Sequence, residues 1–498
     1  GVDFPIGGLL LRDRLPAFRE DPATFSFPTP MSRFTFIGGN FFAFDPNIRT
    51  PYIQSWSFGW QRELTRDMAI EVRYVGNRGT KLWRGFNLNE VNIFENGFLQ
   101  EFINAQRNLA ISRAQGRGNR FDNQGLPGQV PLPIFEAAFG ARGRQPALSL
   151  ASGFGNASFI TLLDQGQAGA MASALASTAT FLCRAVGSAL PRCAALGFDV
   201  PGPLPINFFQ VNPYAANRGV WLLTNASFST YNGLQLIFRR RLAQGWQMTA
   251  HYTFSKALTD LYADSATSSV AFSTLRNRRM DKGPSPWDLT HVFVSDFQYE
   301  LPFGPGRRWS SGSGVLNRFI EGWLVGGIVR IQSGRVFRLV SGRATVNQFE
   351  SGVILKGITI KELQEKIGVR KVPGARDIFF VTPDLIGPDG RSNRAILDVP
   401  TTPGQFGSLV FLRGPRFVKP DLTLQKRTRV TERINIEFWA EFFNAFNYQN
   451  FLIGGPNDAG ITHSIDSTAF GRTTQFFNDL GNQDPGPRMI QFRIRVNF

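Results

Sequence analysis

The chain has 498 residues, with 54 Lys and Arg against 37 Asp and Glu, which gives a formal net charge of +17. Hydrophobic residues make up 42% and charged residues 18%, against about 25% charged in soluble domains. A mostly disordered chain is excluded, because this much apolar surface can offset the entropy of ordering. Two Cys and three His exclude a disulfide-dense scaffold and a His-rich metal site.

Alternation of apolar and polar residues predicts long β-strands with one apolar face. In the last strand, Ile490, Phe492 and Ile494 alternate with Gln491 and Arg493. The absence of a run of 18 strongly apolar residues excludes a transmembrane helix but not transmembrane strands. The pattern predicts nine strands, over residues 55–64, 68–76, 228–242, 246–256, 289–301, 319–333, 417–429, 433–446 and 488–498.

The links between these strands alternate between very short and very long. The short turns lie at 65–67, 243–245 and 430–432, a Gly/Ser-rich link of intermediate length spans Pro302–Arg318, and the chain ends on the same side. This asymmetry is typical of an outer-membrane barrel, which has short periplasmic turns and long extracellular loops. The sequence therefore predicts an all-β, antiparallel transmembrane β-barrel over 55–498 with a periplasmic C-terminus. Residues 1–54 are expected to be an extended segment or loop that leads into it.

Two long insertions, 77–204 and 334–415, are expected to be mostly extracellular. The first is too long for one structureless loop, so we expect it to contain an even number of further strands, with a short helix over 168–182. Cys183 and Cys193 in this insertion predict a disulfide in an oxidising compartment, and the alternative is two buried free thiols. In the second insertion, residues 360–367 predict a short amphipathic helix.

A membrane-spanning barrel turns its apolar residues to lipid and its polar residues to the lumen. A register slip of one residue would exchange the two faces. Trp56, Trp60, Tyr299 and Trp323 are candidates for an interfacial aromatic girdle, and packed core aromatics are the alternative. The candidates for lumen-facing, substrate-contacting residues are Arg330, Asn435, Glu437, Glu441, Gln491, Arg493 and Arg495.

The sequence contains little that predicts chemistry. It has no phosphate-binding glycine loop and no Gly-x-Ser-x-Gly nucleophile motif. Glu437 and Glu441 lie four residues apart on one strand face, about 13 Å at the usual strand rise, too far for a glycosidase pair. We therefore expect no enzyme activity, no cofactor and no metal. Nucleic-acid binding is not expected either, because the Arg residues are spread along the chain without a recognised motif.

Several motifs, in a fixed order, resemble the barrel of TonB-dependent outer-membrane receptors, in particular the Oar-like branch that carries a carboxypeptidase-regulatory-like domain. The resemblance covers nearly the whole chain and rests on residues 54–64, 71–79, 229–235, 252–256, 287–293, 301–304 and 440–447 and on the terminal Phe498. It implies a barrel of about 22 strands plugged by an N-terminal domain, of which this chain would be the C-terminal half or more.

The same resemblance implies several partners. These are outer-membrane lipid and lipopolysaccharide, a TonB complex that acts through an N-terminal part outside this chain, and an unknown substrate. Phe498, with Val496 and Ile494, resembles the signal read by the barrel assembly machinery, and an ordinary edge-strand Phe is the alternative. The leading hypothesis is a receptor that imports a large or scarce substrate. The alternatives are a surface barrel for adhesion or protein secretion and a soluble all-β carbohydrate-binding protein.

Overall fold

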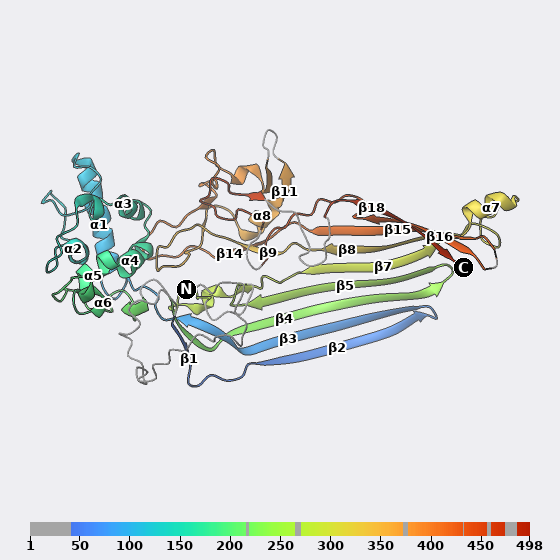
Figure 1. The fold of residues 1–498 in the computed structure, drawn as a ribbon, viewed down its shortest axis with the longest axis horizontal. Helices are drawn as coiled ribbons and strands as arrows, with labels where there is room; N and C mark the ends of the chain where they lie inside the picture. The colour runs from blue at the N-terminus through green and yellow to red at the C-terminus, as the bar shows by residue number, and fades with distance from the viewer. Residues whose placement is uncertain are drawn as a thin grey trace, which may run out of the picture.

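The computed structural model describes residues 41–215, 219–263, 270–371, 377–431, 433–455, 460–473 and 486–498. Its main feature is a large antiparallel sheet along the longest axis of the molecule (Figure 1). Among its nine long strands, each pairs with its neighbours in chain order. They are β2 (Tyr52–Thr65), β3 (Met68–Asn87), β4 (Val220–Ala243), β5 (Trp246–Thr259), β7 (His291–Glu300), β8 (Trp323–Gln332), β15 (Phe417–Arg429), β16 (Asn435–Phe443) and β18 (Met489–Asn497).

All nine predicted strands are confirmed, but some of their boundaries were wrong. β3 and β4 are longer than predicted, because they continue to pair with each other beyond Gly79 as far as Asn87 and Trp221. Residues 319–322, predicted as the start of a strand, instead belong to helix α7 (Gly314–Ile320) and the turn that follows it. The Ser313 side chain caps this helix by accepting a hydrogen bond from the Leu316 N–H, which favours helix over strand at this point.

Short turns and long links lie at opposite ends of the sheet, as the sequence predicts. The turns between β2 and β3, β4 and β5, and β15 and β16 lie at one end, together with α7 and the end of the chain (Figure 1). The long links form folded subdomains at the other end. Two short strands extend the sheet there: β1 (Phe41–Phe44) runs parallel to β4, and β6 (Gly283–Pro284) pairs with β5.

The pairing register separates the side chains into an apolar face and a polar face. Phe438 pairs with Ile494 on the apolar face, and Glu437 pairs with Arg495 on the polar face. Within the described part of the chain, the apolar face is not covered by a second protein layer, since Phe58 is 74%, Phe492 67% and Ile494 70% exposed. A sheet of this kind is unfavourable in water, because each large apolar side chain forfeits about 1.5–3 kcal/mol by remaining exposed.

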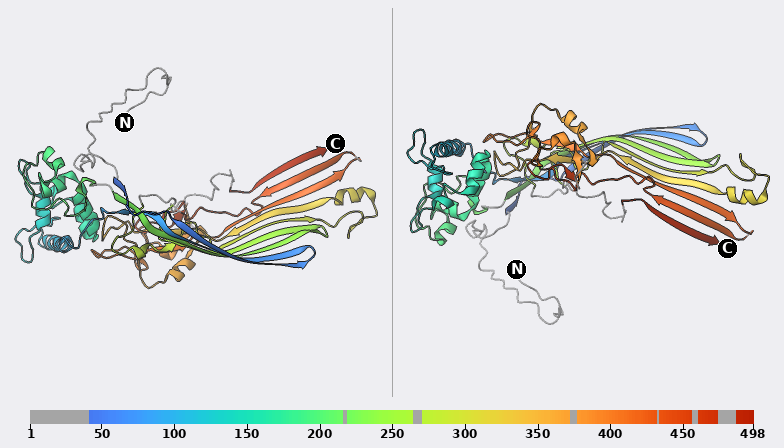
Figure 2. Two further views of the ribbon diagram at one scale, coloured as in Figure 1. Left: turned by 90° about the horizontal axis from the view of Figure 1, so that it is seen from below. Right: turned by 90° about the horizontal axis from the view of Figure 1, so that it is seen from above.

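The sheet is open in the described part of the chain. β2 pairs only with β3, and β18 pairs only with β16, so closure into a barrel is not found. Figure 2 shows that these two outer strands diverge toward the short-turn end. Their outward edges carry unpaired backbone donors and acceptors, which a membrane-spanning sheet has to satisfy by pairing with further strands.

The first insertion folds into a helical subdomain, and our expectation of further strands within it was wrong apart from the extension of β3. A Phe-rich core holds the first four of its helices together, including the fully buried Phe98, Phe102, Phe121 and Phe135, and a second, smaller core holds the last two. Apolar residues here do not alternate but recur at helical spacing, which favours helix. The helices are α1 (Phe98–Ala114), α2 (Pro133–Phe139), α3 (Ala157–Asp164), α4 (Ala168–Ser177), α5 (Ala179–Val186) and α6 (Pro191–Ala195).

A disulfide joins two helices of this subdomain. Cys183 in α5 and Cys193 in α6 are bonded, with their Cα atoms 5.0 Å apart, and both are fully buried.

Among the described residues, no single helix has the length and apolar composition needed to cross a membrane. The pair α4 and α5 meets both criteria only when it is joined across a 78° bend.

The second insertion and residues 460–473 together form a mixed subdomain above the end of the sheet that carries the long links (Figure 1). Its core contains Phe337, Phe380, Leu397 and Phe470. The predicted amphipathic helix is present as α8, which begins with a capping box at Thr359 and buries Leu363. The elements are β9 (Val336–Leu339), β10 (Ile354–Leu355), α8 (Ile360–Glu365), β11 (Ile367–Lys371), β12 (Ile378–Val381), β13 (Leu397–Asp398), β14 (Val410–Arg413) and β17 (Arg472–Thr473).

Candidate functional site

Six of the seven predicted lumen-facing residues come together on the polar face of β16 and β18. Cα pairing places Glu437 beside Arg495 and Glu441 beside Gln491, and Asn435 pairs with the last residue of β18. Arg493 lies 3.5 Å from a Glu441 carboxylate oxygen. The result is a ladder of alternating charges along one face, which the strand period predicts.

The ladder also includes an aromatic ring and a neighbouring strand. The guanidinium of Arg493 lies 4.3 Å from the centre of the Trp439 ring, a cation–π contact. On β15, Arg427 Nε lies 3.6 Å from a Glu437 carboxylate oxygen. These side chains are partly exposed, so each ion pair contributes little to stability, and the groups remain accessible to a polar ligand.

Arg330 lies on the same face but apart from this cluster. It is on β8, where its Cα partners are Lys419 of β15 and Val294 of β7, closer to the folded loops. Its Nε donates a hydrogen bond to Gln332 Oε1 at 3.1 Å. Arg330 and the ladder therefore lie on the same face of the sheet, but the structure does not bring them into contact.

A hollow of about 380 Å³ opens on the polar face over β7, β8, β15 and β16, and the ladder residues Glu441 and Arg493 form part of its lining. It forms because Gly326 has no side chain where its paired neighbours carry Gln298 and Thr423. The carboxylates of Asp296 and Asp421 line the hollow. Neither Asp296 nor Asp421 is among the candidates predicted from the sequence, although a glycine within a strand is a recognised sign of close approach by a ligand or another chain.

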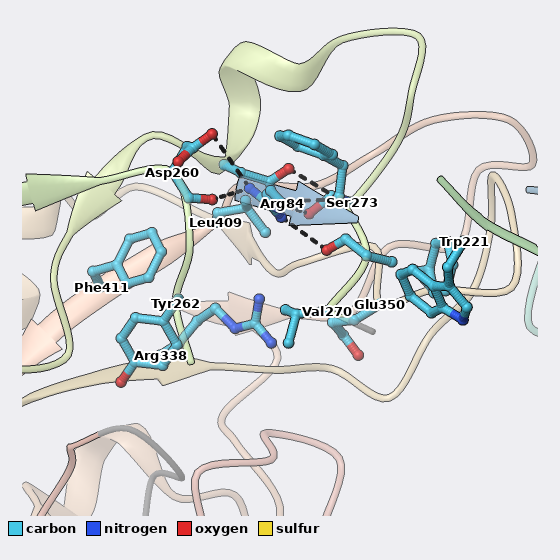
Figure 3. Close-up of a pocket in the computed structure, with 14 residues that line it drawn as sticks. Arg84, Trp221, Asp260, Tyr262, Val270, Ser273, Arg338, Glu350, Leu409 and Phe411 are labelled. Atoms are coloured by element: carbon cyan, nitrogen blue, oxygen red, sulfur yellow. Dashed lines mark hydrogen bonds and ion pairs between the residues drawn. The ribbon is translucent and has the colours of Figure 1, made fainter. Parts of the chain in front are cut away.

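A second cavity, of about 400 Å³, lies at the base of the folded loops (Figure 3). Arg84, near the end of β3, is buried there and donates a hydrogen bond to the Ala271 carbonyl oxygen at 2.9 Å. It forms an ion pair with Asp260 at 3.5 Å and lies 3.4 Å from the centre of the Phe272 ring. Tyr262, Arg338 and Glu350 line the opposite side.

Asp281 adds a further acid to this second cavity. The Ser273 Oγ donates a hydrogen bond to it at 2.7 Å. Burial raises the pKa of Asp281, and the Ser273 hydrogen bonds and the charge of Arg84 oppose that rise. The cavity thus combines charges of both signs with aromatic surface, which suits the binding of a polar ligand.

Glu90 connects the loops above this cavity. Its carboxylate accepts hydrogen bonds from the Thr274 hydroxyl at 2.6 Å, the Leu275 N–H at 2.6 Å and the Asn347 side chain at 2.8 Å. These partners belong to the 257–288 link and to the second insertion. Glu90 therefore fixes three segments that are far apart in sequence.

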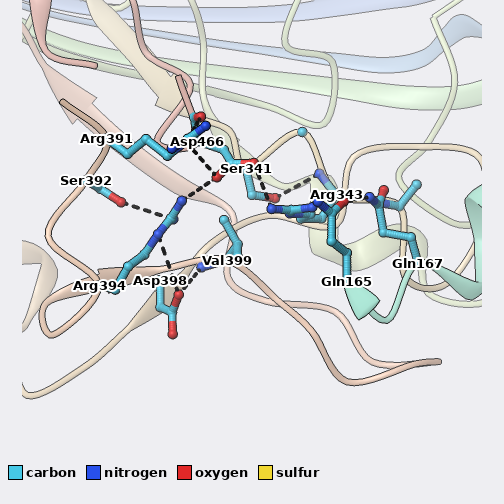
Figure 4. Close-up of polar contacts among 12 residues, drawn as sticks. Gln165, Gln167, Ser341, Arg343, Arg391, Ser392, Arg394, Asp398, Val399 and Asp466 are labelled. Atoms are coloured by element: carbon cyan, nitrogen blue, oxygen red, sulfur yellow. Dashed lines mark hydrogen bonds and ion pairs between the residues drawn. The ribbon is translucent and has the colours of Figure 1, made fainter. Parts of the chain in front are cut away.

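Asp466 has a similar role in the mixed subdomain (Figure 4). Its carboxylate pairs with Arg343 at 2.7 Å and also with Arg394, and its backbone carbonyl accepts a hydrogen bond from Arg391 at 2.9 Å. Because Arg343 is buried, the Asp466 charge compensates a guanidinium that would otherwise be costly to desolvate. This cluster therefore holds segments 341–343, 391–394 and 466 together.

The described residues contain no group of three or more His, Cys, Asp or Glu that could hold a metal ion. The arrangement offers hydrogen-bond donors, acceptors and charges over two cavities and a ladder. Such a surface can bind and guide a solute.

The C-terminal residues Ile494, Val496 and Phe498 all lie at the exposed edge of the sheet, with Phe498 almost fully exposed.

The sequence matches the model of the family described as "Outer membrane beta barrel domain" over residues 12–491. No curated protein shows a significant match. Among solved structures, the outer membrane transporter YddB from Escherichia coli is similar at 7% identity and a TM-score of 0.37, covering 93% of this chain and 34% of its own.

Two further solved structures are similar at comparable levels. The FrpB iron transporter from Neisseria meningitidis has 8% identity and a TM-score of 0.30, with 92% of this chain and 32% of its own covered. The ferripyoverdine receptor of the outer membrane of Pseudomonas aeruginosa has 9% identity and a TM-score of 0.29, with 90% and 27% covered. The chain therefore spans about a third or less of the length of these structures.

Proposed function

Because the chain belongs to the outer membrane β-barrel domain family, which indicates the cell outer membrane as its location, we propose that it forms part of a TonB-dependent receptor barrel. In this proposal the receptor is Oar-like and imports a large or scarce substrate. The ordered motifs that resemble this receptor class, from residues 54–64 to the terminal Phe498, support the assignment.

The observation that carries the proposal is the sheet with one bare apolar face and one charged face. A contiguous apolar surface of this size has to be covered, and lipid covers it without a second protein layer. The opposite face, with the Glu441–Arg493 ladder, then lines an aqueous lumen. A soluble carbohydrate-binding protein is disfavoured, because it would leave side chains such as Phe492 and Ile494 in water.

The two cavities suggest a path for the substrate. The cavity around Arg84 and Asp260 lies under the loop subdomains, where an extracellular substrate would first be bound. The hollow beside Gly326 and the charge ladder lie further along the same sheet toward the short-turn end. We propose that the substrate passes from the first to the second, and that the short-turn end and the C-terminus face the periplasm.

In the same proposal, Phe498, Val496 and Ile494 form the signal for the barrel assembly machinery. All three lie at the exposed edge of the sheet. Replacing Phe498 by Ala in the full-length gene is expected to lower the amount of folded protein in the outer membrane. Equal amounts of the variant and the wild type would reject this role.

The experiment for transport compares uptake by cells that express the full-length gene with and without TonB. Candidate solutes are tested in pools, and uptake is measured by mass spectrometry of cell extracts. We expect uptake of at least one solute to disappear when TonB is deleted and to return when TonB is restored. Uptake that continues unchanged without TonB would reject an energised receptor.

A surface barrel for adhesion is the second candidate, and the helical subdomain favours it. This subdomain has its own Phe-rich core and its own disulfide, Cys183–Cys193, so it is able to present a rigid binding surface. Deleting residues 98–195 separates the two functions. Loss of cell attachment with normal uptake supports adhesion, and loss of uptake alone supports substrate capture by the loops.

A further inference from the structure

The link between β7 and β8 has a feature that the transport proposal does not use. The other links at the short-turn end are tight turns of five residues or fewer, whereas residues 301–322 contain helix α7. This helix does not bury its apolar side chains. Val315 and Phe319 are each 70% exposed, and Leu316 is also exposed.

Helix α7 is fastened to the apolar face of the sheet. Trp323 Nε1 donates a hydrogen bond to the Phe319 carbonyl oxygen, and Lys426 Nζ donates one to the Arg318 carbonyl oxygen, each at 2.8 Å. Trp323 and Lys426 are paired neighbours on β8 and β15, and the register places them on the same face as Leu424. The helix therefore lies on the lipid side of the sheet, not on the lumen side.

Beside α7 there is a hollow of about 880 Å³, formed with the ends of β8 and β15. Its walls include the apolar side chains of Val315, Phe319 and Trp323, and the charged groups among its described lining residues are the cations Arg318 and Lys426. Lys426 is engaged by the end of the helix. Within the described residues, the Arg318 guanidinium makes no hydrogen bond or ion pair, so it is available to an anion.

We propose that this hollow binds a phospholipid of the periplasmic leaflet, with its acyl chains against Phe319 and Trp323 and its anionic phosphate against Arg318. Apolar walls continuous with the lipid-facing sheet, next to an unpaired cation, match the chemistry of an anionic phospholipid at the membrane interface. The leaflet rests on the proposed orientation of the barrel, but lipid binding does not depend on transport, so TonB-independent uptake would leave this inference standing.

The test titrates the delipidated full-length protein in detergent with phosphatidylglycerol or phosphatidylcholine and counts bound lipids by native mass spectrometry. We expect tighter binding of the anionic lipid. Arg318→Gln should weaken phosphatidylglycerol binding about five-fold, the effect of one basic residue near an anionic lipid. Arg307→Gln is the matched control, because Arg307 lies in the same link but already pairs with Glu300 at 2.9 Å, and its affinity should change less than two-fold.

Three results would overturn the proposal. One is an equal loss of affinity in the Arg318 and Arg307 variants, which indicates a general charge effect. Another is displacement of the lipid by millimolar inorganic phosphate, which indicates a free-anion site. The third is unchanged amide hydrogen exchange in α7 of the wild type when phosphatidylglycerol is added. We expect this lipid to slow exchange in α7 but not in α1. This measurement needs no variant, so it tests the site even if the Arg318 variant fails to fold.

Discussion

Placing an arginine at Ile494 tests which face of the sheet meets lipid. Ile494 lies near the middle of β18, pairs with Phe438 of β16 and is 70% exposed. If acyl chains surround it, Arg at this depth costs about 2–4 kcal/mol of folding free energy. The matched control is Gln491→Arg, which adds the same charge three residues away on the polar face beside Glu441. That change is expected to stay within about 0.5 kcal/mol, as for a surface substitution.

The assay is urea unfolding of the full-length protein in lipid vesicles, followed by tryptophan fluorescence and by heat-modifiable gel migration. We expect Ile494→Arg to lower the free energy of unfolding by about 2–4 kcal/mol and Gln491→Arg to leave it almost unchanged. Equal tolerance of the two changes would refute lipid contact on the apolar face. A large cost for Gln491→Arg alone would show that the faces are reversed.

Three further predictions concern the folded loops. Burial raises the pKa of Glu101 to about 7 in the folded chain, above its value in the unfolded chain. The helical subdomain should therefore lose stability as pH rises from about 4.5 to 7, and its stability should then level off. The expected loss is about 2 kcal/mol after allowance for solvent screening. Glu101→Gln should remove this slope in amide hydrogen exchange. Replacing Cys183 and Cys193 by Ser should destabilise α5 and α6 by about 2–3 kcal/mol, the effect of opening a short cross-linked loop; identical exchange in the variant and the wild type would contradict this. Arg84→Ala should cost about 3–5 kcal/mol, because it leaves the buried Asp260 carboxylate without its partner, and the double change to Ala at both positions should cost less than the single one when measured by urea unfolding.

The candidate site could be predicted only in part. The ladder from Asn435 to Arg495 follows from the strand period, because pairing adjacent hairpin strands aligns residues that share a face. Arg330 was assigned to the right face, but its distance from the ladder depends on how far along β8 it lies. The Arg84–Asp260 pair joins residues 176 apart in sequence, and no local pattern indicates such a contact. Gly326 is recognisable in the sequence as a glycine within a predicted strand, and this pattern indicates the hollow beside it.

The positions of the aromatic residues could also be predicted only in part from the sequence. Tyr299 and Trp323 lie at the short-turn ends of β7 and β8 on the apolar face, as a girdle requires. Trp56 and Trp60 are the fifth and ninth of the 14 residues of β2, so neither lies at the short-turn end of that strand. Apolar alternation identifies the face on which a ring lies, whereas its depth depends on where each strand begins and ends.

The sequence by itself determined the nine strands, their two faces and the sorting of short and long links, because a strand between lipid and water repeats its polarity every two residues and is bounded by turn residues. Only the tertiary structure decided what the long links become. The period of two does not extend into them, so the helical subdomain takes its shape from the packing of Phe98, Phe121 and Phe135. The loop contacts of Glu90 and Asp466 arise from residues that meet only after folding.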